Sequence, residues 1–75
     1  MTQLDVAFRY GLEPGEQQML GINRVSEVYG VRKVSFEPAE HIVRVEYDAT
    51  RLTDPIIESL LRRAGLDIKE RVALV

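Results

Sequence analysis

Few side chains in this 75-residue sequence could do chemistry, and several of them lie in one short segment. Glu13 and Glu16 are carboxylates spaced one helical turn apart, and Met19 follows them one turn later. Calcium takes about six to eight oxygen ligands, so two glutamates supply too few. We interpret them as acidic residues at the positive end of a helix. Met19 fits the apolar stripe of that helix, where a core methionine is expected before a copper ligand.

Other reactive side chains are scarce. The sequence has no cysteine, which excludes a disulfide, a zinc finger, an iron–sulfur cluster and a thiol nucleophile. His41 is the only histidine, and we expect it in a turn at the end of the domain away from the two glutamates. The serines lie too far from it to compose a catalytic triad. The sequence therefore predicts no enzyme and no cofactor.

Composition limits the class of protein further. Ten Lys and Arg residues against 12 Asp and Glu residues leave a net charge of −2, whereas nucleic-acid binders carry a basic excess. No apolar run approaches the roughly 20 residues of a membrane-spanning helix, and the amino terminus lacks the features of a secretory signal. We expect one cytoplasmic domain over residues 1–75, with no membrane insertion and no nucleic-acid partner.

Hydrophobic periodicity predicts the elements that must position these residues. Alternation marks strands, and intervals of three and four mark helices, in the order strand, helix, strand, strand, helix, strand. The apolar positions that carry this pattern are Leu4, Val6, Phe8 and Tyr10; Met19, Ile22, Val25 and Tyr29; Val34 and Phe36; Val43, Val45 and Tyr47; Ile57, Leu60, Leu61 and Ala64; and Ile68, Val72 and Leu74. This order predicts an α+β, ferredoxin-like βαββαβ two-layer sandwich, with a four-stranded antiparallel sheet and both helices on one face.

Three finer expectations follow from the same pattern. Gly21, inside the first helix, predicts close packing of that helix on the sheet. Gly30 and Gly65 are expected to end the two helices. Alternation in the last strand places Arg71 on the open face of the sheet and Val72 on the helix side.

From Gly30 onward the sequence resembles the heavy-metal-associated (HMA) domain of copper chaperones and metal-pumping ATPases. Residues 30–36 (GVRKVSF) match that family's second strand, and residues 43–48 (VRVEYD) match its third. Residues 57–66 (IESLLRRAGL) match the closing helix, although Leu66 stands where the family has an aromatic residue. The pattern covers residues 11–68 without a gap. The resemblance implies the ferredoxin-like fold and a role near metal handling.

The sequence departs from the family at the loop that holds the metal ion. That loop reads glycine, methionine, any residue, cysteine, two residues, cysteine. Gly11 and Leu12 fall on its glycine and methionine, and Pro14 and Gln17 fall on its two cysteines. Copper(I) and zinc at such a site need thiolate ligands, which neither residue has. We therefore predict that thiolate metal binding has been lost.

Three functions stay open. The first is a non-catalytic HMA-like protein-interaction or accessory module related to metal-handling proteins, which contacts a protein partner or a second copy through a loop of Gly11, Leu12, Glu13 and Glu16. The second is a copper- or zinc-binding or transport domain with non-cysteine ligands. The third is a small-molecule-sensing regulatory domain, because such domains share this order of elements and bind near the first loop.

Overall fold

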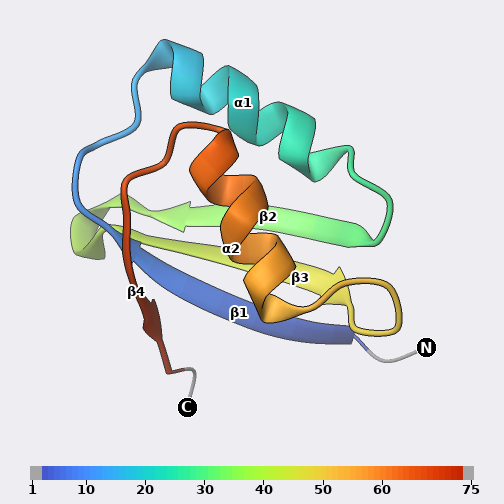
Figure 1. The fold of residues 1–75 in the computed structure, drawn as a ribbon. Helices are drawn as coiled ribbons and strands as arrows, with labels where there is room; N and C mark the ends of the chain where they lie inside the picture. The colour runs from blue at the N-terminus through green and yellow to red at the C-terminus, as the bar shows by residue number, and fades with distance from the viewer. Residues whose placement is uncertain (1–2, 74–75) are drawn as a thin grey trace.

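The computed structural model describes residues 3–73, and its elements follow the predicted order (Figure 1). They are β1 (Gln3–Tyr10), α1 (Glu16–Ser26), β2 (Val31–Glu37), a 3₁₀ turn (Pro38–Glu40), β3 (Ile42–Asp48), α2 (Asp54–Arg63) and β4 (Ile68–Val72). The sheet has the order β2-β3-β1-β4 with every neighbouring pair antiparallel, and both helices cover one face. The predicted ferredoxin-like fold is confirmed.

The hydrophobic core lies between the sheet and the two helices. Alternation correctly predicted most buried side chains of β1 and β3, among them Phe8 and Val45. It was wrong for Leu4, which is 47% exposed near the start of β1. The helical spacing of α2 likewise buries Ile57 and Leu61 completely. No helix within residues 3–73 has the length and apolar character needed to cross a membrane.

Helix α1 is shorter than the periodicity predicted. It ends at Ser26, so Tyr29 lies beyond it, 73% exposed, with the Arg51 guanidinium 4.3 Å from its ring centre. The expectation that Tyr29 belongs to the apolar stripe is therefore wrong. The expectation of a core methionine is also wrong, because Met19 is 39% exposed. Gly30 does adopt the predicted left-handed backbone, at φ +100°, and it directs the chain from this turn into β2.

Gly21 packs closely, but against a different element from the one predicted. A Cβ atom at this position would lie 2.6 Å from the carbonyl oxygen of Ala64, in the residue that follows α2. The missing side chain therefore lets the two helices approach each other, and the expected close contact with the sheet is wrong.

Strand β4 changes phase at Lys69. Tyr10 pairs with Ile68 and Arg9 pairs with Glu70, so Lys69 is one extra residue on the edge strand. The shift places Arg71 on the helix side, where its Nη2 lies 2.8 Å from Oδ2 of Asp54 at the start of α2. Val72 moves to the open face. Simple alternation predicted the reverse for both residues, because it cannot register a bulge.

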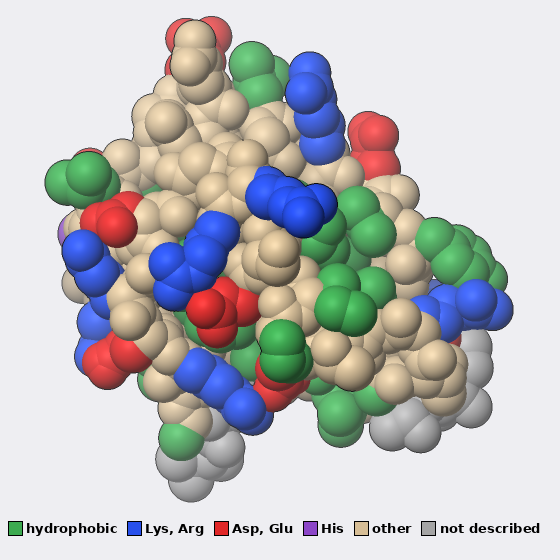
Figure 2. Space-filling view, in the orientation of Figure 1, with side chains coloured by type: hydrophobic (Ala, Val, Ile, Leu, Met, Phe, Trp, Pro, Cys, Tyr) green, Lys and Arg blue, Asp and Glu red, His purple; other side chains and the backbone are tan. Residues whose placement is uncertain are grey.

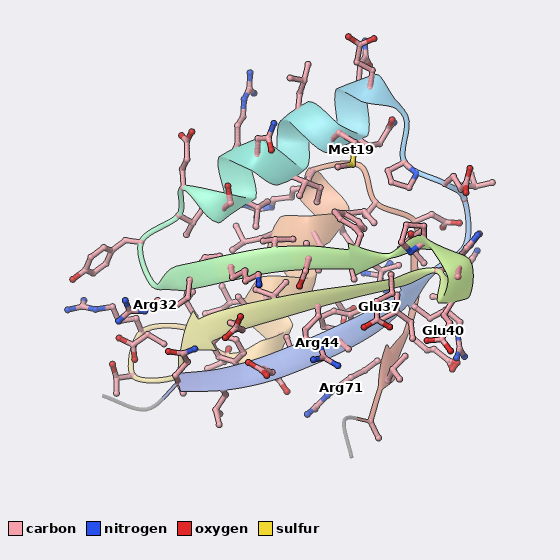
Figure 3. The ribbon with its side chains drawn as sticks, turned by 180° about the vertical axis from the view of Figure 1, so that it is seen from behind. Met19, Arg32, Glu37, Glu40, Arg44 and Arg71 are labelled. Atoms are coloured by element: carbon pink, nitrogen blue, oxygen red, sulfur yellow. The ribbon has the colours of Figure 1, made fainter. Side chains whose placement is uncertain are left out.

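The open face of the sheet carries mixed charges over a small buried residue. Ala7 lies between Arg44 and Val72 in the sheet and is completely buried. Figure 3 shows Arg44 on this face, with Glu37 and Glu40 toward one end. Within residues 3–73 the Arg44 Nε is buried and has no hydrogen-bond partner.

Candidate functional site

The residues that the sequence singled out lie together where β1 gives way to α1. Gly11, Leu12, Glu13 and Pro14 belong to the β1–α1 loop (residues 11–15), and Glu16 and Gln17 begin α1. Pro14 is half-buried in this loop, whereas Gln17 is exposed in the first helical turn. We call this region, with the side chains packed beside it, the loop site.

Asp67 fixes the start of the loop. Its carbonyl oxygen accepts a hydrogen bond of 2.9 Å from the Gly11 amide, and its Oδ2 accepts one of 3.2 Å from the Leu12 amide. Lys69 Nζ lies 3.3 Å from the same Oδ2. The sequence reasoning missed Asp67. The signal was available, because antiparallel pairing of β1 with β4 brings the residue before β4 beside the residue after β1.

His41 anchors the loop from the other side, which corrects the expectation that it lies at the opposite end. Its Nδ1 is 3.0 Å from the carbonyl oxygen of Gly11, and its ring stacks on Tyr10 with 5.1 Å between centroids. A carbonyl oxygen only accepts, so Nδ1 is the donor here. Because β3 runs antiparallel to β1, the turn before β3 lies at the end of β1. The pairing of these two strands therefore brings His41 next to Gly11.

An apolar hollow of about 290 Å³ lies beside the loop. It is lined by Tyr10, Glu13, Pro14, Met19, Phe36 and Pro38. The ring of Tyr10 meets that of Phe36 edge-on, with 5.9 Å between centroids. Burial, and then the negative charge of Glu13, raise the pKa of the Tyr10 hydroxyl. The hollow therefore combines an aromatic wall with an acidic rim.

Leu12 projects from the pinned loop and is 74% exposed. The loop is closed at its other end by a 2.9 Å hydrogen bond from the Gly15 amide to Oε1 of Gln18. Bonded amides at both ends limit the movement of the backbone that carries Leu12. An exposed leucine on a fixed backbone offers apolar surface to another molecule without the cost of ordering the loop.

The charge around the hollow is predominantly acidic, and the one cation beside Gly11 among the described residues, Lys69, is paired with Asp67. Segments 10–23 and 34–43, which surround the hollow, contain four glutamates and no lysine or arginine. The four are Glu13, Glu16, Glu37 and Glu40. A surface of this kind favours a cationic partner by electrostatic complementarity.

The residues of the loop site do not fit a copper or zinc ion. Pro14 has no side-chain donor atom, and Gln17 offers only a neutral amide. His41 already directs Nδ1 at the Gly11 carbonyl oxygen. Across residues 3–73, no three His, Cys, Asp or Glu side chains are grouped closely enough to hold a metal. The hollow can instead bury an apolar side chain of a partner beside the carboxylates of its rim.

No protein-family model and no curated protein matches this chain. Two of the solved structures that resemble it are domains of metal-handling proteins. The yeast copper transporter domain CCC2A, determined in the apo and Cu(I)-loaded states, is 20% identical with a TM-score of 0.71, over 92% of this chain and 94% of that one. The apo form of the N-terminal domain of ZntA is 20% identical with a TM-score of 0.67, over 92% and 93%. The chain therefore has the fold of these domains, as the resemblance to HMA domains implies.

Proposed function

We propose that this chain is a non-catalytic protein-interaction domain, an accessory module related to metal-handling proteins, in which the loop site docks a partner protein. One observation carries the proposal: Leu12 is exposed on a loop whose amides are fixed by Asp67, while Pro14 and Gln17 occupy the cysteine positions of the resembling family.

The hydrogen bonds of the loop support docking through their effect on entropy. A free loop loses conformational freedom when it binds, and that loss weakens the complex. Here Asp67, His41 and Gln18 already hold Gly11, Leu12 and Gly15. A partner therefore gains the contact with Leu12 without having to order the loop.

The charges support a partner of a particular kind. The glutamates around the hollow favour an apolar side chain flanked by lysine or arginine. Such a partner places its apolar group against Leu12 and Pro14 and its cations against Glu13 and Glu40. Its association is expected to weaken as salt is added, because these carboxylates are exposed.

An amide NMR titration tests this proposal with a defined probe. The probe is a helical peptide of about 15 residues with leucines at helical spacing and lysines between them. We expect saturable shifts at residues 11–16, which Leu12→Ser removes. Leu20→Ser is the matched control, because Leu20 is also an exposed leucine and lies on α1 away from the loop site. Shifts that ignore Leu12→Ser would contradict the proposal.

A metal titration tests the main alternative. Calorimetry with Cu(I) and with Zn²⁺ is expected to show no binding at the loop site. Micromolar or tighter binding that shifts the amides of residues 11–17 would overturn the proposal and favour a metal carrier with non-cysteine ligands.

A further inference from the structure

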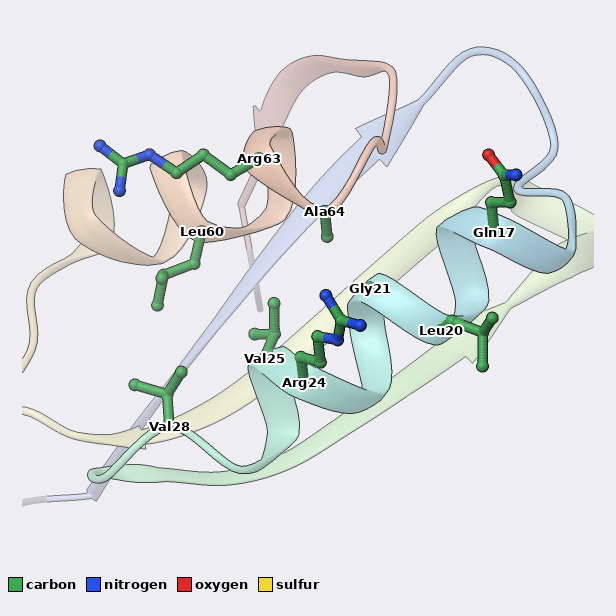
Figure 4. A pocket seen from close by; sticks show the side chains of 9 residues that line it. All are labelled: Gln17, Leu20, Gly21, Arg24, Val25, Val28, Leu60, Arg63 and Ala64. Carbon is green, nitrogen blue, oxygen red and sulfur yellow. The ribbon is translucent and has the colours of Figure 1, made fainter.

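A second surface lies on the outer side of the helical layer. The helices touch where Gly21 faces Ala64, and a groove of about 460 Å³ opens between them (Figure 4). Its apolar lining is Leu20, Val25, Val28, Leu60 and Ala64. Leu20 is 57% exposed at the rim, whereas Val25 is buried in the floor. We call this surface the helix groove.

Two arginines line the helix groove without partners. Arg24 comes from α1 and Arg63 from the last turn of α2. Within residues 3–73, neither makes a hydrogen bond or an ion pair. Five other basic side chains of residues 3–73, which do not line the groove, are ion-paired: Arg9, Arg51, Arg62, Lys69 and Arg71. Figure 2 shows hydrophobic side chains between the helices with basic side chains beside them.

We infer that the helix groove docks an acidic amphipathic helix of a partner protein. A cleft between two helices accepts the apolar ridge of a third, because side-chain ridges pack into grooves. Carboxylates flanking that ridge meet Arg24 and Arg63, whose charges are not used within the described part of the chain. This inference does not rest on the loop site, which shares Gln17 with the helix groove but carries glutamates where the groove carries arginines.

A second copy of this chain is the competing occupant. Its β1–α1 loop carries Leu12 next to Glu13, an apolar and acidic pair that suits the helix groove of a neighbouring copy. That contact joins two different surfaces, so it would produce a ring where the rotation between copies closes and an open chain of molecules where it does not. The β1–α1 loop is not helical and does not present a ridge of side chains to a groove between helices, so we favour a helix of a separate partner.

The test is an amide NMR titration with a glutamate version of the leucine peptide, about 15 residues long. We expect saturable shifts at Leu20, Val25 and Leu60. Arg24→Glu and Arg63→Glu should each raise the Kd at least about tenfold, because they replace attraction by repulsion at the groove. Arg62→Glu is the matched control, since it makes the same charge change one residue away, where the native side chain is paired with Glu58. That variant should bind nearly as well as the native chain.

Three results would overturn the inference. The first is the absence of saturable shifts along the helix groove. The second is equal weakening by Arg62→Glu and Arg63→Glu, which would mean attraction to overall charge alone. The third is concentration-dependent self-association in sedimentation that Arg63→Glu removes, which would make a second copy the occupant. Because the lysine peptide and Leu12→Ser report on the loop site, failure here is distinguishable from failure of the proposed function.

Discussion

The loop site and the helix groove are built by different kinds of interaction and carry opposite charge. At the loop site, hydrogen bonds from Asp67 and His41 hold a short segment that has no regular structure. At the helix groove, steric contact at Gly21 sets the separation of two regular elements, and unpaired arginines lie at its edge. The two surfaces adjoin at Gln17 in the first turn of α1, but different interactions hold them in place.

The largest expected effect is a gain of Cu(I) binding at the loop site. Pro14→Cys combined with Gln17→Cys should increase Cu(I) affinity at least about a thousandfold, because thiolates are the ligands that soft metals select. Calorimetry under reducing conditions measures it. Glu13→Cys with Glu16→Cys keeps the same spacing one residue earlier and should gain far less. Equal gains would show that the loop is not aligned with the family's metal motif.

The next largest effect is a loss of folding stability at the helix contact that shapes the helix groove. Gly21→Ala should lower the free energy of unfolding by about 1–2 kcal/mol, because the new methyl group meets the Ala64 carbonyl oxygen and this outweighs the gain in helix propensity. Urea denaturation measures the change. Asn23→Ala, on the exposed side of the same helix, should be neutral or slightly stabilising. A stabilising Gly21→Ala would contradict the close helix contact.

Alkaline pH should loosen the base of α2. The Tyr47 hydroxyl donates to Oδ1 of Asp54, and burial, followed by that hydrogen bond, raises the pKa of Tyr47 from 10.0 to about 12. Above pH 10 the unfolded chain releases this proton while the folded chain retains it, so stability present below pH 10 is lost as the pH rises toward 12.

Tyr47→Phe isolates this contribution. It should cost about 1 kcal/mol near neutral pH and reduce the alkaline loss in urea denaturation. Part of the loss should remain, because burial also raises the pKa of Tyr10. Parallel loss of stability by the variant and the native chain above pH 10 would contradict the assignment.

The smallest expected effect is a loss of stability and of amide protection in the β1–α1 loop. Asp67→Ala should cost about 0.5–1 kcal/mol and speed amide hydrogen exchange over residues 11–15, because the Leu12 amide loses its acceptor. Lys69→Ala removes only an exposed ion pair and should change exchange there very little. Exchange along α1 should be unaltered in both variants. Faster exchange in α1 would contradict the independence of the two surfaces.

Periodicity predicted the parts of the fold that repeat regularly. Alternation placed Phe8 and Val45 in the core, and helical spacing did the same for Ile57. It failed where one residue departs from the repeat: an extra residue, Lys69, reversed Arg71 and Val72 in β4. No propensity marks such a bulge, because it arises from pairing with β1.

The loop site was predicted in its sequence position but not in its surroundings. Gly11, Leu12 and Glu13 were predicted by aligning the sequence with the loop motif of the HMA family. Asp67 and His41 come from strand partners distant in sequence, and only the sheet order places them beside Gly11. The helix groove was missed because Arg24 and Arg63 lie on separate helices, whose relative position depends on the contact of Gly21 with Ala64.

The bulge in β4 has one more consequence. Asp67, two residues before the extra residue Lys69, accepts a hydrogen bond from the Leu12 amide, and Arg71, two residues after it, is ion-paired with Asp54 at the start of α2. A single short edge strand therefore contacts both the β1–α1 loop and the start of α2. A molecule that paired with β4 and removed its bulge would therefore disturb the Asp67–Leu12 hydrogen bond and the Arg71–Asp54 ion pair together.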